Sequence, residues 1–208
     1  MTVYVESNFV LEQALQQEQC DACDDILNLA ASNAILLAVP AFSLAEPHQA
    51  LALKKKTRNR LTNELRSHFS ELGRSKPYRG VPDDFTALAS VLIRSSEQER
   101  DGLQRATSEL LRTATVMPLD AAILIFAGDL QVTLSMSGQD AIVLASVLRH
   151  LQDTTPNESC FLSRNSRDFD DPDVRGKLEP FGCRYFAEFD SALQYIQTRV
   201  RSQGPPSL

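Results

Sequence analysis

Four polar side chains of the sequence have the types and positions needed to bind a divalent metal ion. Each comes after an expected strand or at the start of an expected helix. They are Glu6, Glu46, Asp140 and Asn165. Carboxylate and amide oxygens suit Mg²⁺ or Mn²⁺, whereas zinc sites usually include His or Cys, and neither type occurs at the matching positions. We therefore expect a magnesium or manganese site if the fold brings these residues together.

A parallel sheet is what would bring them together. Apolar runs of strand type alternate with helical patterns, which is typical of an α/β fold with helices on both faces of the sheet. The expected strands are Val3–Val5, Ile35–Val39, Ser159–Ser163 and Arg184–Ala187. Parallel strands share one carboxyl edge, which is where ligands bind in such sheets. Three of the four polar residues should converge there, and the helix headed by Asp140 can face the same edge.

Three acids at one edge would repel each other. Two unit charges about 4 Å apart repel by roughly 4 kcal/mol at an effective dielectric constant near 20. Bare carboxylates would spread apart or take up protons. Since a divalent cation removes this conflict, the expected convergence itself favours a metal ion.

Two long helical patterns, separated by a segment rich in glycine and proline at 73–82, predict an antiparallel helical hairpin. We place this hairpin at about residues 43–115. Ser43 and Glu46 match a capping box at its first turn, because they are three residues apart at the start of the pattern.

Composition sets the domain organisation and the expected location. The chain has 208 residues, of which 43% are hydrophobic, so we predict one domain at residues 1–200 and a flexible tail at 201–208. No apolar run reaches the roughly 18 residues of a membrane span, and we expect a soluble, cytoplasmic protein with no membrane partner. Cys20 and Cys23 have metal-type spacing but no second pair completes four ligands, so reduced thiols are expected.

Positive charge is concentrated in one helical segment, although the net charge is −6. The basic cluster consists of Lys54, Lys55, Lys56, Arg58 and Arg60. A charge run of this kind is usually a solvated helix face, but a surface that binds nucleic acid needs the same residues. Both alternatives stay open.

Four short motifs, in order along the chain, resemble those of the PIN-domain nucleases, a family that includes the VapC-like ribonuclease toxins of bacterial toxin–antitoxin pairs. The opening Val-Tyr-Val-Glu-Ser-Asn-Phe-Val-Leu resembles the family's strand that ends in an acid, a Ser or Thr, and Asn. These positions are Glu6, Ser7 and Asn8. Val-Pro-Ala-Phe-Ser-Leu-Ala-Glu resembles the second motif and ends at Glu46.

The last two motifs lie in the C-terminal half. Gln-Asp-Ala-Ile-Val-Leu-Ala resembles the third motif, with Asp140 as its acid. Leu-Ser-Arg-Asn-Ser-Arg-Asp-Phe resembles the fourth, with Ser163 and Asn165 at the site and Asp168 in the trailing Asp-Phe pair. The four motifs together extend over most of the chain.

This resemblance implies a three-layer α/β/α fold and hydrolysis of RNA phosphodiester bonds. Glu6, Glu46 and Asp140 would hold one or two Mg²⁺ or Mn²⁺ ions, with Asn165 completing the catalytic set. Ser7, Asn8, Ser163 and Asp168 would orient the ligands and the scissile phosphate. The partners implied are RNA, an antitoxin protein and a second copy of the chain in a homodimer.

Alternatives remain at each level. Glu6 and Asn165 stand where the family more often has Asp, which favours a catalytically weak RNA-binding or protein-interaction module. Glu46 and Asp140 each follow a Ser by three residues and would also serve as helix caps, and Asn165 would suit an Asx-turn. A phosphotransfer domain is disfavoured, because no paired Asp follows the first strand and no Lys is placed near the last strands to grip a phosphate.

Overall fold

A five-stranded sheet forms the centre of the computed structural model, which describes residues 1–79 and 81–202, the side chains of 81–84 excepted. The strands are β1 (Thr2–Val5), β2 (Leu36–Pro40), β3 (Ala114–Met117), β4 (Ser159–Leu162) and β5 (Cys183–Phe186). Their order across the sheet is β3-β2-β1-β4-β5, and all neighbouring pairs are parallel. The predicted α/β fold with a central parallel sheet is confirmed.

Both faces of the sheet are buried, as the sequence of β1 requires. Val3 and Val5 lie in one hydrophobic core, and Tyr4 between them lies in the other. Successive side chains of a strand point to opposite faces, so an uninterrupted apolar strand needs a helical layer on each side.

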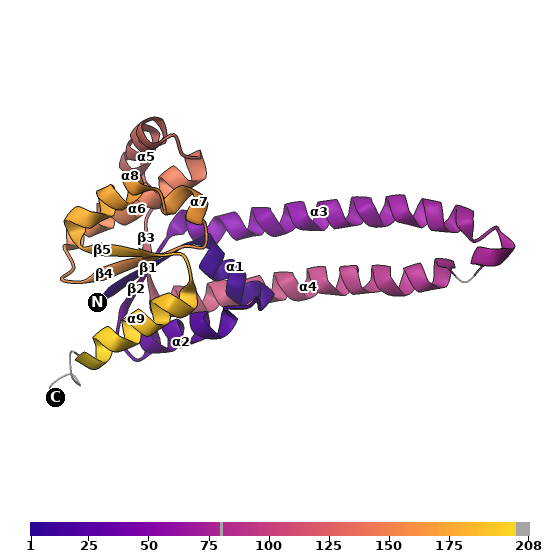
Figure 1. Ribbon diagram of the computed structural model, residues 1–208, viewed down its shortest axis with the longest axis horizontal. Coiled ribbons are helices and arrows are strands. Elements are labelled where there is room, and N and C mark those ends of the chain that lie inside the picture. The colour runs from indigo at the N-terminus through magenta and orange to yellow at the C-terminus, as the bar shows by residue number, and fades with distance from the viewer. Residues whose placement is uncertain (80, 203–208) are drawn as a thin grey trace.

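The two helical layers are drawn in Figure 1, above and below the sheet. One layer contains α1 (Ser7–Leu15), α2 (Cys20–Ala31) and α9 (Phe189–Ser202). The other contains α5 (Ala121–Leu134), α6 (Gly138–Thr154), α7 (Ser166–Phe169) and α8 (Pro172–Leu178). A short 3₁₀ helix, η2 (Glu179–Phe181), precedes β5. The arrangement is the expected three-layer α/β/α fold.

The predicted hairpin consists of α3 (Ala41–Leu72) and α4 (Val81–Thr113), with the 3₁₀ helix η1 (Lys76–Tyr78) between them. Figure 1 shows it projecting far beyond the sheet. The rings of Phe69 and Phe85 are 5.0 Å apart near its far end. Midway along, the Arg58 guanidinium donates two hydrogen bonds of 2.8 Å to the Glu99 carboxylate. These contacts hold the two helices together away from the sheet.

The base of the hairpin packs against α1 through a glycine. A Cβ atom on Gly102 of α4 would lie 2.2 Å from the carbonyl oxygen of Ala14 in α1. Because the neighbouring atom belongs to the backbone, no side-chain rotation can relieve that clash. Only glycine allows α4 to approach α1 this closely.

One expected helix start is wrong. α3 begins at Ala41, with Pro40 in the N-cap position, and Ser43 lies inside the helix. Ser43 is fully buried, and within the described residues its hydroxyl has no hydrogen-bond partner. The capping box proposed for Ser43 and Glu46 therefore does not form, because the rigid φ angle of Pro40 already suits the residue before a helix and starts α3 earlier.

Three other differences concern the second half of the chain. The strand β3 was not predicted, and neither were the short helices α7 and α8. The last helix continues to Ser202, so the first two residues of the expected tail are helical. Residues 203–208 of that tail lie outside the described residues.

Within the described ranges, no single helix is both long and apolar enough to cross a membrane. Helices α5 and α6 reach that length and hydropathy only as a pair, and they are bent by 116° relative to each other.

Candidate functional site

A pocket of about 430 Å³ lies where the strand order reverses, at the carboxyl ends of β1 and β4. This switch point is the usual ligand position in open α/β sheets. The polar residues expected at the site that line the pocket are Glu6, Ser7, Asn8, Glu46, Asp140 and Asn165. The structure thus brings all four candidate metal-site residues to one place.

Glu6 is the most buried acid of the pocket and has only 4% of its surface exposed. It is the N-cap of α1, and its Oε2 accepts a 3.0 Å hydrogen bond from the Asn8 backbone N–H. Its other oxygen, Oε1, is buried and has no partner among the described residues. Burial raises the pKa of Glu6 to about 7, an effect that Asn8 opposes and the nearby Glu46 carboxylate adds to. A carboxyl group with this pKa can hold or release a proton near neutral pH.

Glu46 reaches the pocket from the second turn of α3. The buried Ser7 hydroxyl, at the start of α1, donates a hydrogen bond to its Oε2 atom. Helix α3 begins directly after β2, and α1 begins directly after β1. The two residues therefore meet because β1 and β2 are adjacent parallel strands.

Asp140 lies in the first turn of α6 and is held from two sides. Ser137 is the N-cap: its Oγ accepts from the Asp140 backbone N–H at 3.1 Å, and its hydroxyl donates to Asp140 Oδ2 at 2.5 Å. The cap expected at Ser137 is confirmed. The Asn165 side-chain amide donates to Asp140 Oδ1 at 3.0 Å.

Ser163 and Asn165 follow β4; Asn165 lines the pocket, whereas Ser163 is absent from its lining. The Ser163 Oγ accepts a 3.0 Å hydrogen bond from the Asn165 backbone N–H, and its carbonyl accepts one of 2.7 Å from the Tyr185 hydroxyl. Ser163 is fully buried, and its side chain lowers the pKa of Glu6. Asn165 stands at the N-cap of α7 but turns its side chain to Asp140 instead of capping the helix.

Asp168 is not brought to the pocket. It lies in α7, where its backbone N–H donates to the Asn165 carbonyl at 3.3 Å. Its neighbour Phe169 is fully buried and packs edge-on against Phe161, with ring centroids 5.0 Å apart. The Asp-Phe pair therefore anchors α7 to the sheet through Phe169, and Asp168 is absent from the pocket lining.

The basic cluster also lies apart from the pocket lining, along α3. Arg58 is bound to Glu99, and the Lys54 ammonium is 3.4 Å from the same carboxylate. Lys55 and Lys56 are exposed, and Arg60 is 4.0 Å from Glu64. Part of the cluster thus holds the hairpin together, and Lys55 and Lys56 remain exposed, so their contact with RNA stays a prediction.

Two polar pocket residues, Gln139 and Arg164, were not among the predicted site residues. Gln139 precedes Asp140 at the start of α6, and Arg164 lies between Ser163 and Asn165. Their positions in the sequence could have identified them, because both are direct neighbours of residues predicted at the same edge of the sheet. Arg164 is a cation and has no capacity to bind a metal ion, which is why a metal-site pattern does not include it.

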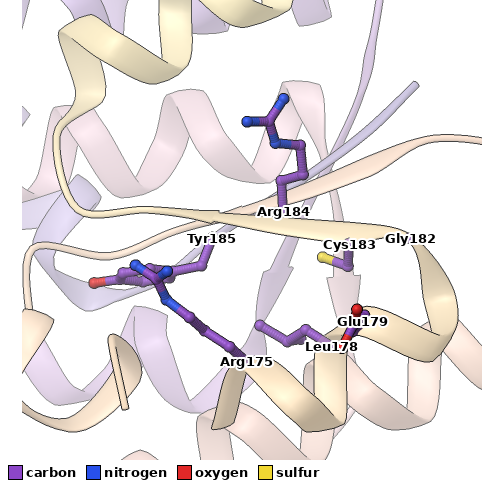
Figure 2. Close-up of a pocket in the computed structure, with 7 residues that line it drawn as sticks. All are labelled: Arg175, Leu178, Glu179, Gly182, Cys183, Arg184 and Tyr185. Carbon is purple, nitrogen blue, oxygen red and sulfur yellow. The ribbon is translucent and has the colours of Figure 1, made fainter. Parts of the chain in front are cut away.

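A second pocket, of about 350 Å³, lies between α8 and the edge strand β5 and is drawn in Figure 2. Arg184 points away from it, to the opposite side of the strand (Figure 2). The Arg175 guanidinium pairs with Asp170. Burial raises the pKa of the Cys183 thiol to about 12, so this cysteine is no nucleophile at neutral pH.

The donors of the first pocket match a hard divalent cation by type, since they are three carboxylates and an amide oxygen. The unpartnered Oε1 of Glu6 is the atom most in need of such a partner. In the described part of the chain, however, no three His, Cys, Asp or Glu side chains lie close enough together to hold a metal ion as they stand. Metal binding therefore requires these carboxylates to move closer together than they lie here.

Together, the fold and the pocket define an α/β protein with an acidic pocket at the switch point of a parallel sheet. No family model matches the chain, and no curated protein matches it.

Proposed function

We propose that the protein is a metal-dependent endoribonuclease that hydrolyses RNA phosphodiester bonds. The observation that carries the proposal is the gathering of Glu6, Glu46, Asp140 and Asn165 in one pocket at the switch point. These residues come from four separate segments of the chain, and each belongs to one of the motifs that resemble PIN-domain nucleases.

Each residue has a distinct role in this proposal. Glu6, Glu46 and Asp140 would hold Mg²⁺ or Mn²⁺, which when bound supplies an activated water and offsets the charge of the scissile phosphate. Ser7 fixes Glu46, and Asn165 fixes Asp140, so that the carboxylates keep a defined orientation.

Cleavage of a mixed RNA pool with Mg²⁺ or Mn²⁺ tests the proposal. Native protein should cleave, and Asp140→Asn should lose activity by at least about tenfold, because it removes a charged ligand. Asp168→Asn is the matched control: it makes the same change in the same set of motifs, outside the pocket, and should retain activity. Equal cleavage by the native protein and Asp140→Asn, or no cleavage by the native protein, would contradict the proposal.

A catalytically weak RNA-binding or protein-interaction module is the second candidate. It is favoured by the hydrogen bonds that Glu46 and Asp140 already accept, because these bonds satisfy the two acids without a metal ion. Native protein that binds RNA without cleaving it in the same assay would support this candidate. The proposed toxin role, with an antitoxin partner, is tested by a short adjacent reading frame that encodes a DNA-binding protein.

A further inference from the structure

Arg164 is a cation in a pocket that otherwise carries negative charge. It lines the pocket together with Glu6, Glu46 and Asp140. Its side chain is 36% exposed, so part of it faces the opening and part is enclosed. An RNA substrate is an anion, and three carboxylates repel it unless a positive group meets the phosphate.

The Arg164 guanidinium is held in place by a buried acid. Its Nη1 donates a 2.8 Å hydrogen bond to Oε2 of Glu12, whose side chain is only 1% exposed. The other oxygen of Glu12 accepts from the Gln19 backbone N–H at 2.6 Å, which fixes the carboxylate in turn. Glu18 lies 3.5 Å from Nη1, but its side chain is 82% exposed, so this ion pair contributes little to fixing the arginine.

The guanidinium keeps unused donors. A guanidinium has five N–H groups, and the contacts to Glu12 and Glu18 both involve Nη1. In the described part of the chain, Nε and Nη2 make no hydrogen bond or ion pair that would occupy them. One edge of the group is thus fixed by a buried carboxylate, and another is free to bind two oxygens of one phosphate.

We propose that Arg164 forms an anion subsite that binds a backbone phosphate of the nucleic acid, and that Glu12 is the positioning residue that orients it. This inference rests on the proposed function, because it assigns a substrate contact in the same pocket. Lysine would not replace the arginine fully, since a point charge lacks the planar pair of donors. The phosphate that Arg164 binds is one that lies next to the acidic residues of the pocket.

Steady-state cleavage of a short single-stranded RNA tests the subsite. Arg164→Gln should raise KM by about tenfold or more, with a smaller change in kcat, because it removes a charge-assisted hydrogen bond to the substrate. Arg164→Lys should have a KM between those of the native protein and Arg164→Gln. Glu12→Gln should raise KM by a smaller factor, since the arginine keeps its charge but loses its orientation. Arg167→Gln, which removes an exposed arginine outside the pocket lining, should leave KM unchanged.

Salt dependence separates phosphate binding from a merely structural role. Binding of the same RNA, fluorescently labelled, is measured by anisotropy with Ca²⁺ in place of Mg²⁺. The slope of log affinity against log salt concentration should fall by about 0.7 in Arg164→Gln, as expected when one phosphate of a single strand is no longer neutralised. Arg167→Gln should keep the native slope. An unchanged slope and affinity in Arg164→Gln would overturn the subsite.

Failure of the subsite and failure of the nuclease proposal have different outcomes. If the native protein cleaves RNA and Arg164→Gln has the native KM, only the subsite is wrong. If the native protein does not cleave, the binding measurement alone decides on the subsite. Arg164→Gln leaves Glu12 buried without its partner and can unfold the chain. The double variant Glu12→Gln with Arg164→Gln removes both charges, and it should fold and show the same reduced slope.

Discussion

Replacing Glu6 with glutamine should change how the stability of the protein depends on pH. Burial raises the pKa of Glu6 from its ordinary value of 4.5 to about 7. Below pH 4.5 the carboxyl is protonated in the folded and the unfolded chain, and it has no effect. Between pH 4.5 and 7 the folded state binds more protons than the unfolded state, so stability falls as the pH rises. Above pH 7 both states are ionised and the loss levels off.

The size of the effect follows from the two pKa values. The full loss is on the order of 3 kcal/mol, and most of it falls between pH 5 and pH 8. Glu6→Gln has no carboxyl at this position to ionise, so its stability does not fall in this way as the pH rises. Any constant cost of the buried amide is the same at both pH values and cancels from the comparison.

Urea unfolding with EDTA present, at pH 5 and pH 8, measures the difference. The free energy of unfolding of the native protein should fall between the two pH values by roughly 2–3 kcal/mol more than that of Glu6→Gln. Glu71→Gln, on the exposed surface of α3, is the control and should follow the native protein. If native protein and Glu6→Gln show parallel pH dependence, Glu6 does not have a raised pKa and the electrostatic description of the pocket is wrong.

Two further predictions concern packing and the cysteines. Gly102→Ala should lower stability by about 1–3 kcal/mol in thermal unfolding, because its Cβ would meet the Ala14 carbonyl at 2.2 Å. Gly128→Ala, in α5, has nothing within 4 Å of its Cβ and should instead gain up to about 1 kcal/mol of helix propensity; equal effects of the two would refute the packing argument. In the folded protein a thiol reagent should modify Cys20 alone, since the other three cysteines are buried, and all four should react in denaturant. Rapid reaction of a second thiol in the folded chain would contradict this burial.

The placement of the acids could be argued from the sequence because it depends on topology alone. Parallel strands share a carboxyl edge, so Glu6 after β1 and Asn165 after β4 were expected at the same edge, and they lie near each other because these two strands are neighbours in the sheet. The position of Asp140 in the first turn of a helix could be predicted from the recognisable N-cap at Ser137. These features are local patterns combined with one general rule of chain connection.

Other features had no local signal. The strand β3 follows α4 without an intervening turn residue, so its four residues look like the end of a helix. The hydrogen bond between Glu12 and Arg164 joins residues 152 positions apart, and no periodicity encodes such a pair. The failed capping box at Ser43 shows the opposite problem, a local pattern that its neighbour Pro40 overrides.

The hairpin gives the molecule hydrodynamic properties unlike those of a sphere of the same mass. A helix of 32 residues is about 48 Å long, whereas the radius of gyration of a compact chain of this size is about 17 Å. The arm increases friction in solution, so a single 23.1 kDa chain should elute early in gel filtration. Early elution is thus the expected behaviour of the monomer, and light scattering is the measurement that distinguishes it from the predicted homodimer.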